Sequence, residues 1–267
     1  MPSSFSLPPP DPLNPPAKPP RKRRGVAFVL CGALAAGAYA LYAGWGLVPE
    51  RFNPWAPLDV AAPPDFLTGY KLSRARSDPA LCLRALAQTG MRYDPLPDRV
   101  TGPGCGFEHA VRLRGAGVRM GAPLSLSCPM ALSFFMWEKH VLQPAAERHF
   151  GQRVVAIEHL GSYACRNINR GEGSTPSNTV ASEPRSRHAT ANALDIAGFT
   201  LENGKRITVL KQWQHANPAA SPGAEAQLLT DAHTGACRFF NGVLGPDYNA
   251  VHRDHFHLET GGYTMCR

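Results

Sequence analysis

The sequence predicts an α+β domain in which a small antiparallel sheet is flanked by helices and stapled by disulfides, preceded by one transmembrane helix. Two patterns predict the domain: apolar residues follow a helical spacing in its first half and alternate as in strands in its second half. Six of the seven cysteines also lie after residue 80, and an even number suits a disulfide framework. One long uncharged apolar segment near the N-terminus predicts the transmembrane helix.

Residues 1–24 form a proline-rich tail that ends in Arg21, Lys22, Arg23 and Arg24. Residues 25–48 are almost wholly apolar, and a helix of that length, at about 1.5 Å per residue, crosses a hydrocarbon layer of ~30 Å. The positive-inside rule keeps the basic tail cytoplasmic. We therefore expect an uncleaved signal-anchor in the inner membrane and a periplasmic C-terminal domain. A cleaved signal peptide, which would also export the domain, and a buried core helix are the alternatives.

Residues 49–80 carry Pro54, Pro57, Pro63 and Pro64 without a sustained hydrophobic period, which predicts a semi-rigid periplasmic tether. The folded domain is expected at 81–267. Within it, helical spacing predicts helices at 81–88, 129–149 and 227–240. Alternation predicts strands at 154–160, 194–201, 206–209 and 255–259. Asn203 and Gly204 are a hairpin turn signal between two of these strands.

The cysteines of the domain are expected to form three structural bridges. No C-x-x-C spacing occurs, which disfavours a cysteine-ligated zinc site or a thioredoxin-like redox pair. The fifteen possible connectivities stay open. They involve Cys82, Cys105, Cys128, Cys165, Cys237 and Cys266.

The net charge of +8 would suit a polyanionic partner. The densest basic run, however, is residues 18–24, beside the apolar segment, and the C-terminal half mixes charges of both signs without a basic-aromatic stripe. Nucleic-acid binding is therefore not expected.

Two segments carry the residue types of a metal site. In residues 186–197, His188 precedes the predicted strand that contains Asp195, so a short turn brings the two side chains together. In residues 252–259, strand alternation places His255 and His257 on one side, with His252 nearby. Imidazole and carboxylate groups are zinc ligands, and a catalytic zinc site keeps one position open for water.

These residues carry a resemblance. The pattern S-x-H-x-x-G-x-A-x-D followed by H-x-H resembles the metallopeptidases grouped with lysostaphin, the D-alanyl-D-alanine peptidases and the hedgehog signalling domain. The stretches GSYACRNINR, HATANALDIAGF, ACRFFNGVLGPDYNA and HRDHFHLE resemble the bacterial extensin-like C-terminal domain family over residues 81–267. The resemblance implies a zinc ion held by His188, Asp195 and His257.

The resemblance also implies roles for neighbouring residues. His255 falls at the position of a general base or transition-state stabiliser, and His252 at that of an additional histidine in the murein endopeptidase branch. Asp254 takes the place of a glutamate base, although a regular strand would turn it away from the metal. Arg166 resembles an arginine that binds a substrate carboxylate or the oxyanion, with a structural arginine as the alternative. Ala191 replaces a glycine, and its single additional methyl group is tolerated if φ is negative there.

The expected function is zinc-dependent hydrolysis of peptide bonds in peptidoglycan stem peptides, as a D,D-endopeptidase or carboxypeptidase. The alternative is a non-catalytic zinc-containing domain that binds the cell wall or envelope partners, in which His252 would close the metal site as a fourth ligand. An adhesion domain held by disulfides without a metal is the third interpretation.

Overall fold

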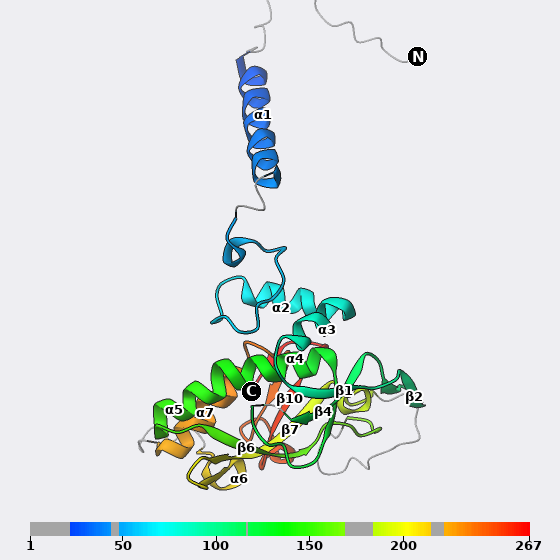
Figure 1. Ribbon diagram of the computed structural model, residues 1–267, viewed down its shortest axis with the longest axis vertical. Helices are drawn as coiled ribbons and strands as arrows, with labels where there is room; N and C mark the ends of the chain where they lie inside the picture. Colours follow the sequence, from blue (N-terminus) through cyan, green and yellow to red (C-terminus); the bar gives the residue numbers. More distant parts are fainter. Residues whose placement is uncertain (1–21, 44–47, 116, 169–183, 215–221) are drawn as a thin grey trace, which may run out of the picture. The chain divides into compact units, whose positions relative to one another are not determined.

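The computed structural model describes residues 22–43, 48–115, 117–168, 184–214 and 222–267 (Figure 1). The chain divides into two compact units, Met1–Asn53 and Pro54–Arg267. The first unit contains α1 (Lys22–Ala43) and the short 3-10 helix η2 (Glu50–Phe52). Phe28, Val29 and Leu34 of α1 are exposed. Residues 1–21 of the predicted tail and 44–47 of the predicted membrane segment lie outside the described residues. In the described part of the chain, no helix has the length and apolar character needed to cross a bilayer.

The second unit begins earlier than the sequence suggests. The segment expected to be an irregular tether contains α2 (Thr68–Ser77), and it contributes Leu58, Val60 and Leu72 to the hydrophobic core. The sequence pattern misses α2 because few of its residues are apolar. The next helix, α3 (Pro79–Ala87), matches the prediction, and the Asp78 side chain caps it by accepting hydrogen bonds from two backbone N–H groups.

Strands also occur in the first half of the domain, where only helices were expected. A three-stranded antiparallel sheet has the order β1-β4-β5, formed by Arg92–Pro95, Ala110–Gly115 and Leu124–Ser127. A separate hairpin pairs β2 (Arg99–Gly102) with β3 (Cys105–Phe107). Most of these strands have only three or four residues, which is too short for alternation to be recognised in the sequence.

The helix predicted at 129–149 is confirmed as α4 (Cys128–Trp137) and α5 (Gln143–Phe150), joined by a π-helical turn, η3 (Glu138–Leu142). Ser127 caps its start, and Gly151 ends it in a left-handed conformation. Trp137 is fully buried and donates its indole N–H to the carbonyl oxygen of Ala232 in α7 (Ala224–Ala236). The sequence predicted α7 at 227–240, and the observed helix both starts and ends earlier than these bounds. Figure 1 shows α4, α5 and α7 together on one side of the main sheet.

The main sheet has six strands in the order β11-β9-β10-β7-β6, with β8 also paired to β7. All pairs are antiparallel except β11 with β9. The predicted Asn203-Gly204 turn joins β7 to β8, and Gly204 has a φ of +84°. The predicted strand at 206–209 ends at Thr208, since Val209 begins α6 (Val209–Gln212). The strands are β6 (Val154–Gly161), β7 (Ala193–Leu201), β8 (Arg206–Thr208), β9 (Gly242–Leu244), β10 (Phe256–Glu259) and β11 (Met265–Cys266).

Three disulfides are present, as expected, and the structure gives their connectivity. Cys82–Cys128 joins α3 to α4, Cys105–Cys165 joins β3 to the segment after β6, and Cys237–Cys266 joins the end of α7 to β11. Cys31 in α1 is free and exposed. Fixed links therefore connect helices and strands that are far apart in the sequence.

Candidate metal centre

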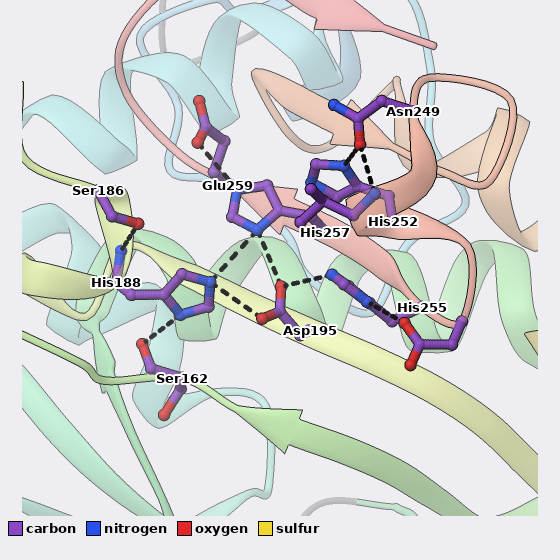
Figure 2. Close-up of polar contacts among 11 residues, drawn as sticks. Ser162, Ser186, His188, Asp195, Asn249, His252, His255, His257 and Glu259 are labelled. Atoms are coloured by element: carbon purple, nitrogen blue, oxygen red, sulfur yellow. Dashed lines mark hydrogen bonds and ion pairs between the residues drawn. The ribbon is translucent and has the colours of Figure 1, made fainter. Parts of the chain in front are cut away.

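The side chains of His188, Asp195 and His257 converge at one point (Figure 2). Asp195 and His257 are direct partners in the register of β7 and β10, so their side chains lie next to each other. His188 comes from the 3-10 helix η4 (Arg187–Thr190), which ends just before β7. One potential ligand atom from each residue lies within 4.8 Å of the others. Of the residues that the structure describes, these three form the group able to hold a metal ion.

The spacing of the donor atoms fits tetrahedral coordination. Bonds of 2.0–2.1 Å to zinc place two ligand atoms roughly 3.3–3.4 Å apart at the tetrahedral angle. His188 Nε2 lies 3.3 Å from His257 Nδ1 and 3.2 Å from Asp195 Oδ2. His257 Nδ1 lies 2.8 Å from Asp195 Oδ1. Small shifts of these side chains therefore suffice to surround a metal ion.

The outer nitrogen of each imidazole has a partner that orients the ring. His188 Nδ1 donates to the carbonyl oxygen of Ser162 (3.3 Å), so with a metal bound Nε2 is the nitrogen whose lone pair points at the cluster. His257 Nε2 donates to Glu259 Oε2 (3.0 Å), which directs its Nδ1 to the same point. Metal-binding histidines are commonly held in this way. Neither partner was predicted from the sequence, although Glu259 is two residues beyond His257 and strand alternation indicates it.

The charges of the cluster favour a bound cation. Burial alone would raise the pKa of Asp195, yet the hydrogen bonds from His188 and His257 lower it, so the carboxylate stays ionised. Burial would lower the pKa of His257, but its hydrogen bonds to Asp195 and Glu259 raise the pKa to about 9. In the absence of a metal, a proton on His257 therefore supplies the positive charge between the two carboxylates.

Asp195 and His257 line a cleft of about 680 Å³, together with His252, His255 and Arg166, whereas His188 is buried beside them and outside its lining. His255 Nε2 lies 3.6 Å from Asp195 Oδ1, and His255 Nδ1 lies 2.9 Å from Asp254 Oδ1. The prediction that His255 is part of the strand was wrong, because β10 begins at Phe256. Asp254 nonetheless contacts His255 and is absent from the metal-binding group.

His252 lies beside the triad without joining it. Its Nδ1 donates to Asn249 Oδ1 (2.7 Å), and that oxygen also accepts the backbone N–H of Val251 (3.0 Å), so His252 Nε2 is left as the acceptor. The ring centroids of His252 and His257 are 5.8 Å apart. Burial, together with the nearby His257 and His255, lowers the pKa of His252 to about 4. The ring is therefore neutral near pH 7.

Arg166 contributes a cation to the same cleft. It lies in the wall of the cleft, where its Nη1 contacts the carbonyl oxygen of Asn167 at 3.4 Å. Both interpretations of this arginine, as a substrate-binding residue or as a structural one, are compatible with that position.

The turn between the first two candidate ligands has an unusual conformation at Ala191. Its φ is +54°, in the left-handed region, so the condition of a negative φ is not met. Such a conformation costs an alanine about 1–2 kcal/mol. The turn is held by neighbouring contacts: Ala191 accepts the backbone N–H of Ser127 (2.8 Å), and the Asn192 side chain accepts the Ser127 hydroxyl (2.6 Å) and donates to Thr190 Oγ1 (2.9 Å). These bonds fix the path of the chain from His188 to Asp195.

Comparisons with known proteins support the resemblance at the family level. Neither a curated protein nor a solved structure is significantly similar to the chain. The family model described as extensin-like protein C-terminus matches residues 80–267. The match starts one residue before the predicted domain and includes all six candidate site residues. The wider placement among zinc metallopeptidases stays a prediction. The chain belongs to the extensin-like protein C-terminus family.

Proposed function

We propose that this protein is a zinc-dependent hydrolase of peptide bonds in peptidoglycan stem peptides, anchored in the inner membrane by residues 25–48 with its C-terminal domain in the periplasm. The observation that carries the proposal is the convergence of His188, Asp195 and His257, of which Asp195 and His257 line an open cleft. Three protein ligands and an open position are typical of catalytic zinc, whereas structural zinc has four protein ligands. The three disulfides and the resemblance support an oxidising compartment and a wall substrate.

The residues around the triad suit hydrolysis of an amide bond. Zinc bound by the triad would lower the pKa of a water molecule and polarise the substrate carbonyl. His255 lies beside Asp195 and is held through its Nδ1 by Asp254, so its Nε2 faces the cleft and can exchange a proton with the reacting groups. His252 offers a second neutral imidazole with Nε2 free to accept a proton. Arg166 supplies positive charge for a carboxylate or an oxyanion.

A non-catalytic zinc domain that binds the cell wall or envelope partners is the second candidate. The position of His252 favours it, because its ring is 5.8 Å from His257 and its Nε2 is free to become a fourth ligand. A movement of the 3-10 helix η5 (Ala250–His252) would be enough to close the site.

Incubation of the full-length chain, in mild detergent, with purified peptidoglycan separates the two candidates. Hydrolysis predicts released fragments with new amino termini in mass spectra, lost with a chelator and in His255→Ala. The matched control is His159→Ala, since this half-buried histidine of β6 is not among the residues that line the cleft and its Nε2 bonds the carbonyl oxygen of Ala122. Stoichiometric zinc without any released fragment would refute hydrolysis and favour the binding domain.

A further inference from the structure

Arg187 lies where two cavities meet. It lines the metal cleft of about 680 Å³ and also a second cavity of about 790 Å³, which is bordered by the β2–β3 hairpin and the start of α3. Arg187 precedes the candidate ligand His188 in the same 3-10 helix. Of the residues that the structure describes, Arg187 is the one that lines both cavities, so a ligand that reached both would contact its side chain.

The backbone around Arg187 leaves room for its guanidinium group. Gly261 and Gly262, directly after β10, have φ values of +77° and +72°. A Cβ atom at position 262 would lie 2.5 Å from Arg187 Nη2, and one at position 261 would lie 3.6 Å from Nη1. The two glycines thus form a flat wall against which the guanidinium lies, and no larger residue at 262 is compatible with this position.

Within the described ranges of the chain, the guanidinium of Arg187 makes no hydrogen bond and no ion pair. The neighbouring arginines differ in this respect. Arg185 donates to the carbonyl oxygen of Pro103 (2.9 Å) and to Asn167 Oδ1 (2.8 Å), and Arg76 donates to the carbonyl oxygen of Phe239 (3.0 Å). The donors of Arg187 therefore stay available to a ligand, and a planar guanidinium suits a carboxylate bound through two parallel hydrogen bonds.

We propose that Arg187 binds a carboxylate group of the substrate at the junction of the two cavities, so that an extended peptide runs from the metal cleft into the second cavity. Arg187 is next to the candidate ligand His188 in the sequence, but its role is to recognise an acidic group away from the scissile bond. The identity of the polymer rests on the proposed function, whereas the requirement for a carboxylate rests on Arg187 alone.

The test is co-sedimentation of the metal-free full-length chain with peptidoglycan. One batch of peptidoglycan keeps its carboxylates, and a matched batch has them converted to amides with carbodiimide and ammonia. Hydrogen bonds to a charged group change affinity by about 10–100-fold. The wild-type chain should bind the native polymer at least ~10-fold more tightly than the amidated polymer. Arg187→Gln should bind both polymers equally, and Arg187→Lys should show an intermediate preference.

Two further variants distinguish recognition from general effects. Arg112→Gln removes the same charge from an exposed position on β4 and should keep the wild-type preference. Gly262→Ala keeps the arginine but displaces its guanidinium, and should lose the preference, with circular dichroism to verify folding. The proposal is overturned if Arg187→Gln keeps the preference, if Arg112→Gln loses it equally, or if the wild-type chain shows none. Because the protein is metal-free, these outcomes are independent of whether peptidoglycan is hydrolysed.

Discussion

Metal binding at the triad is expected to displace a proton from His257, so the metal affinity should rise with pH. In the metal-free protein, burial disfavours the charged ring, but the hydrogen bonds to Asp195 and Glu259 raise its pKa to about 9. The proton on Nδ1 occupies the position that a metal would take. It must leave before the metal binds.

The size of the effect follows from this pKa. Well below a pKa of about 9, the loss of one proton on binding makes the apparent affinity rise tenfold per pH unit. Because His257 is half deprotonated at pH 9, the rise between pH 7 and pH 9 is about 50-fold, or ~2.3 kcal/mol. The stability of the metal-free fold changes with pH in the opposite direction. A pKa raised from 6.5 to about 9 contributes about 3 kcal/mol, fully present below pH 6.5 and lost as the pH rises through 9.

Competition between the metal-stripped chain and a chromophoric chelator for zinc, at several pH values from 6.5 to 8.5, measures the slope. After correction for the chelator, the logarithm of the affinity should rise with a slope near one. Glu259→Gln removes one of the two carboxylates that hold the proton and should flatten the slope at the upper end of this range. A wild-type affinity that is constant from pH 7 to 8.5 would refute the assignment of His257 Nδ1 as a ligand atom.

Three further predictions concern stability and are measured by denaturant unfolding. Replacing Cys82 and Cys128 by alanine removes a link between residues 46 apart and should lower the unfolding free energy by ~4 kcal/mol; a loss below ~1 kcal/mol would contradict it. Ala191→Val should destabilise by more than ~2 kcal/mol, because a β-branched residue disfavours a φ of +54°, whereas Ala191→Gly should change stability by less than ~1 kcal/mol, since relief of strain offsets the lost methyl burial. Burial raises the pKa of Glu138, although a hydrogen bond from Gln143 opposes this shift. The folded state therefore disfavours the charged carboxylate, and Glu138 lowers the stability of the fold at pH values above its unfolded-state pKa. Glu138→Gln should therefore be more stable than wild type at pH 8, with the difference shrinking toward pH 4, and equal stability at both pH values would contradict this.

The members of the metal centre could be predicted because local rules give the directions of the side chains within each segment, and the resemblance implied that the two segments meet. The pairing of β7 with β10 brings them together. His188 and Asp195 are separated by a short turn and a strand start, and the β10 alternation predicts the direction of His257. The same rule gave the wrong element for His255, which precedes β10 and reaches the cluster from a turn. The alternation rule applies only inside a strand, and the residue at which a strand begins is the hardest to predict.

Contacts between distant segments could not be predicted. Two of these contacts join residues more than 20 positions apart: the pairing of the six cysteines and the bond from His188 to the Ser162 carbonyl oxygen. A third, the packing of Leu58 into the core, involves a segment without any periodic pattern. The helix α2 was missed because its buried positions are few, and the first-half strands because they are short. The left-handed Ala191 was unexpected because an alanine gives no signal for positive φ; the bonds made by Ser127 and Asn192 hold it in place.

Metal content is the measurement that tests the central assignment most directly. Elemental analysis of the purified full-length chain, reconstituted with zinc and then dialysed, should give about one zinc per wild-type chain and less than about a tenth of that in His188→Ala and Asp195→Asn. His159→Ala, outside the cleft, should keep the full amount. Far less than one zinc in the wild-type chain, or an undiminished amount in His188→Ala, would contradict a metal centre formed by His188, Asp195 and His257.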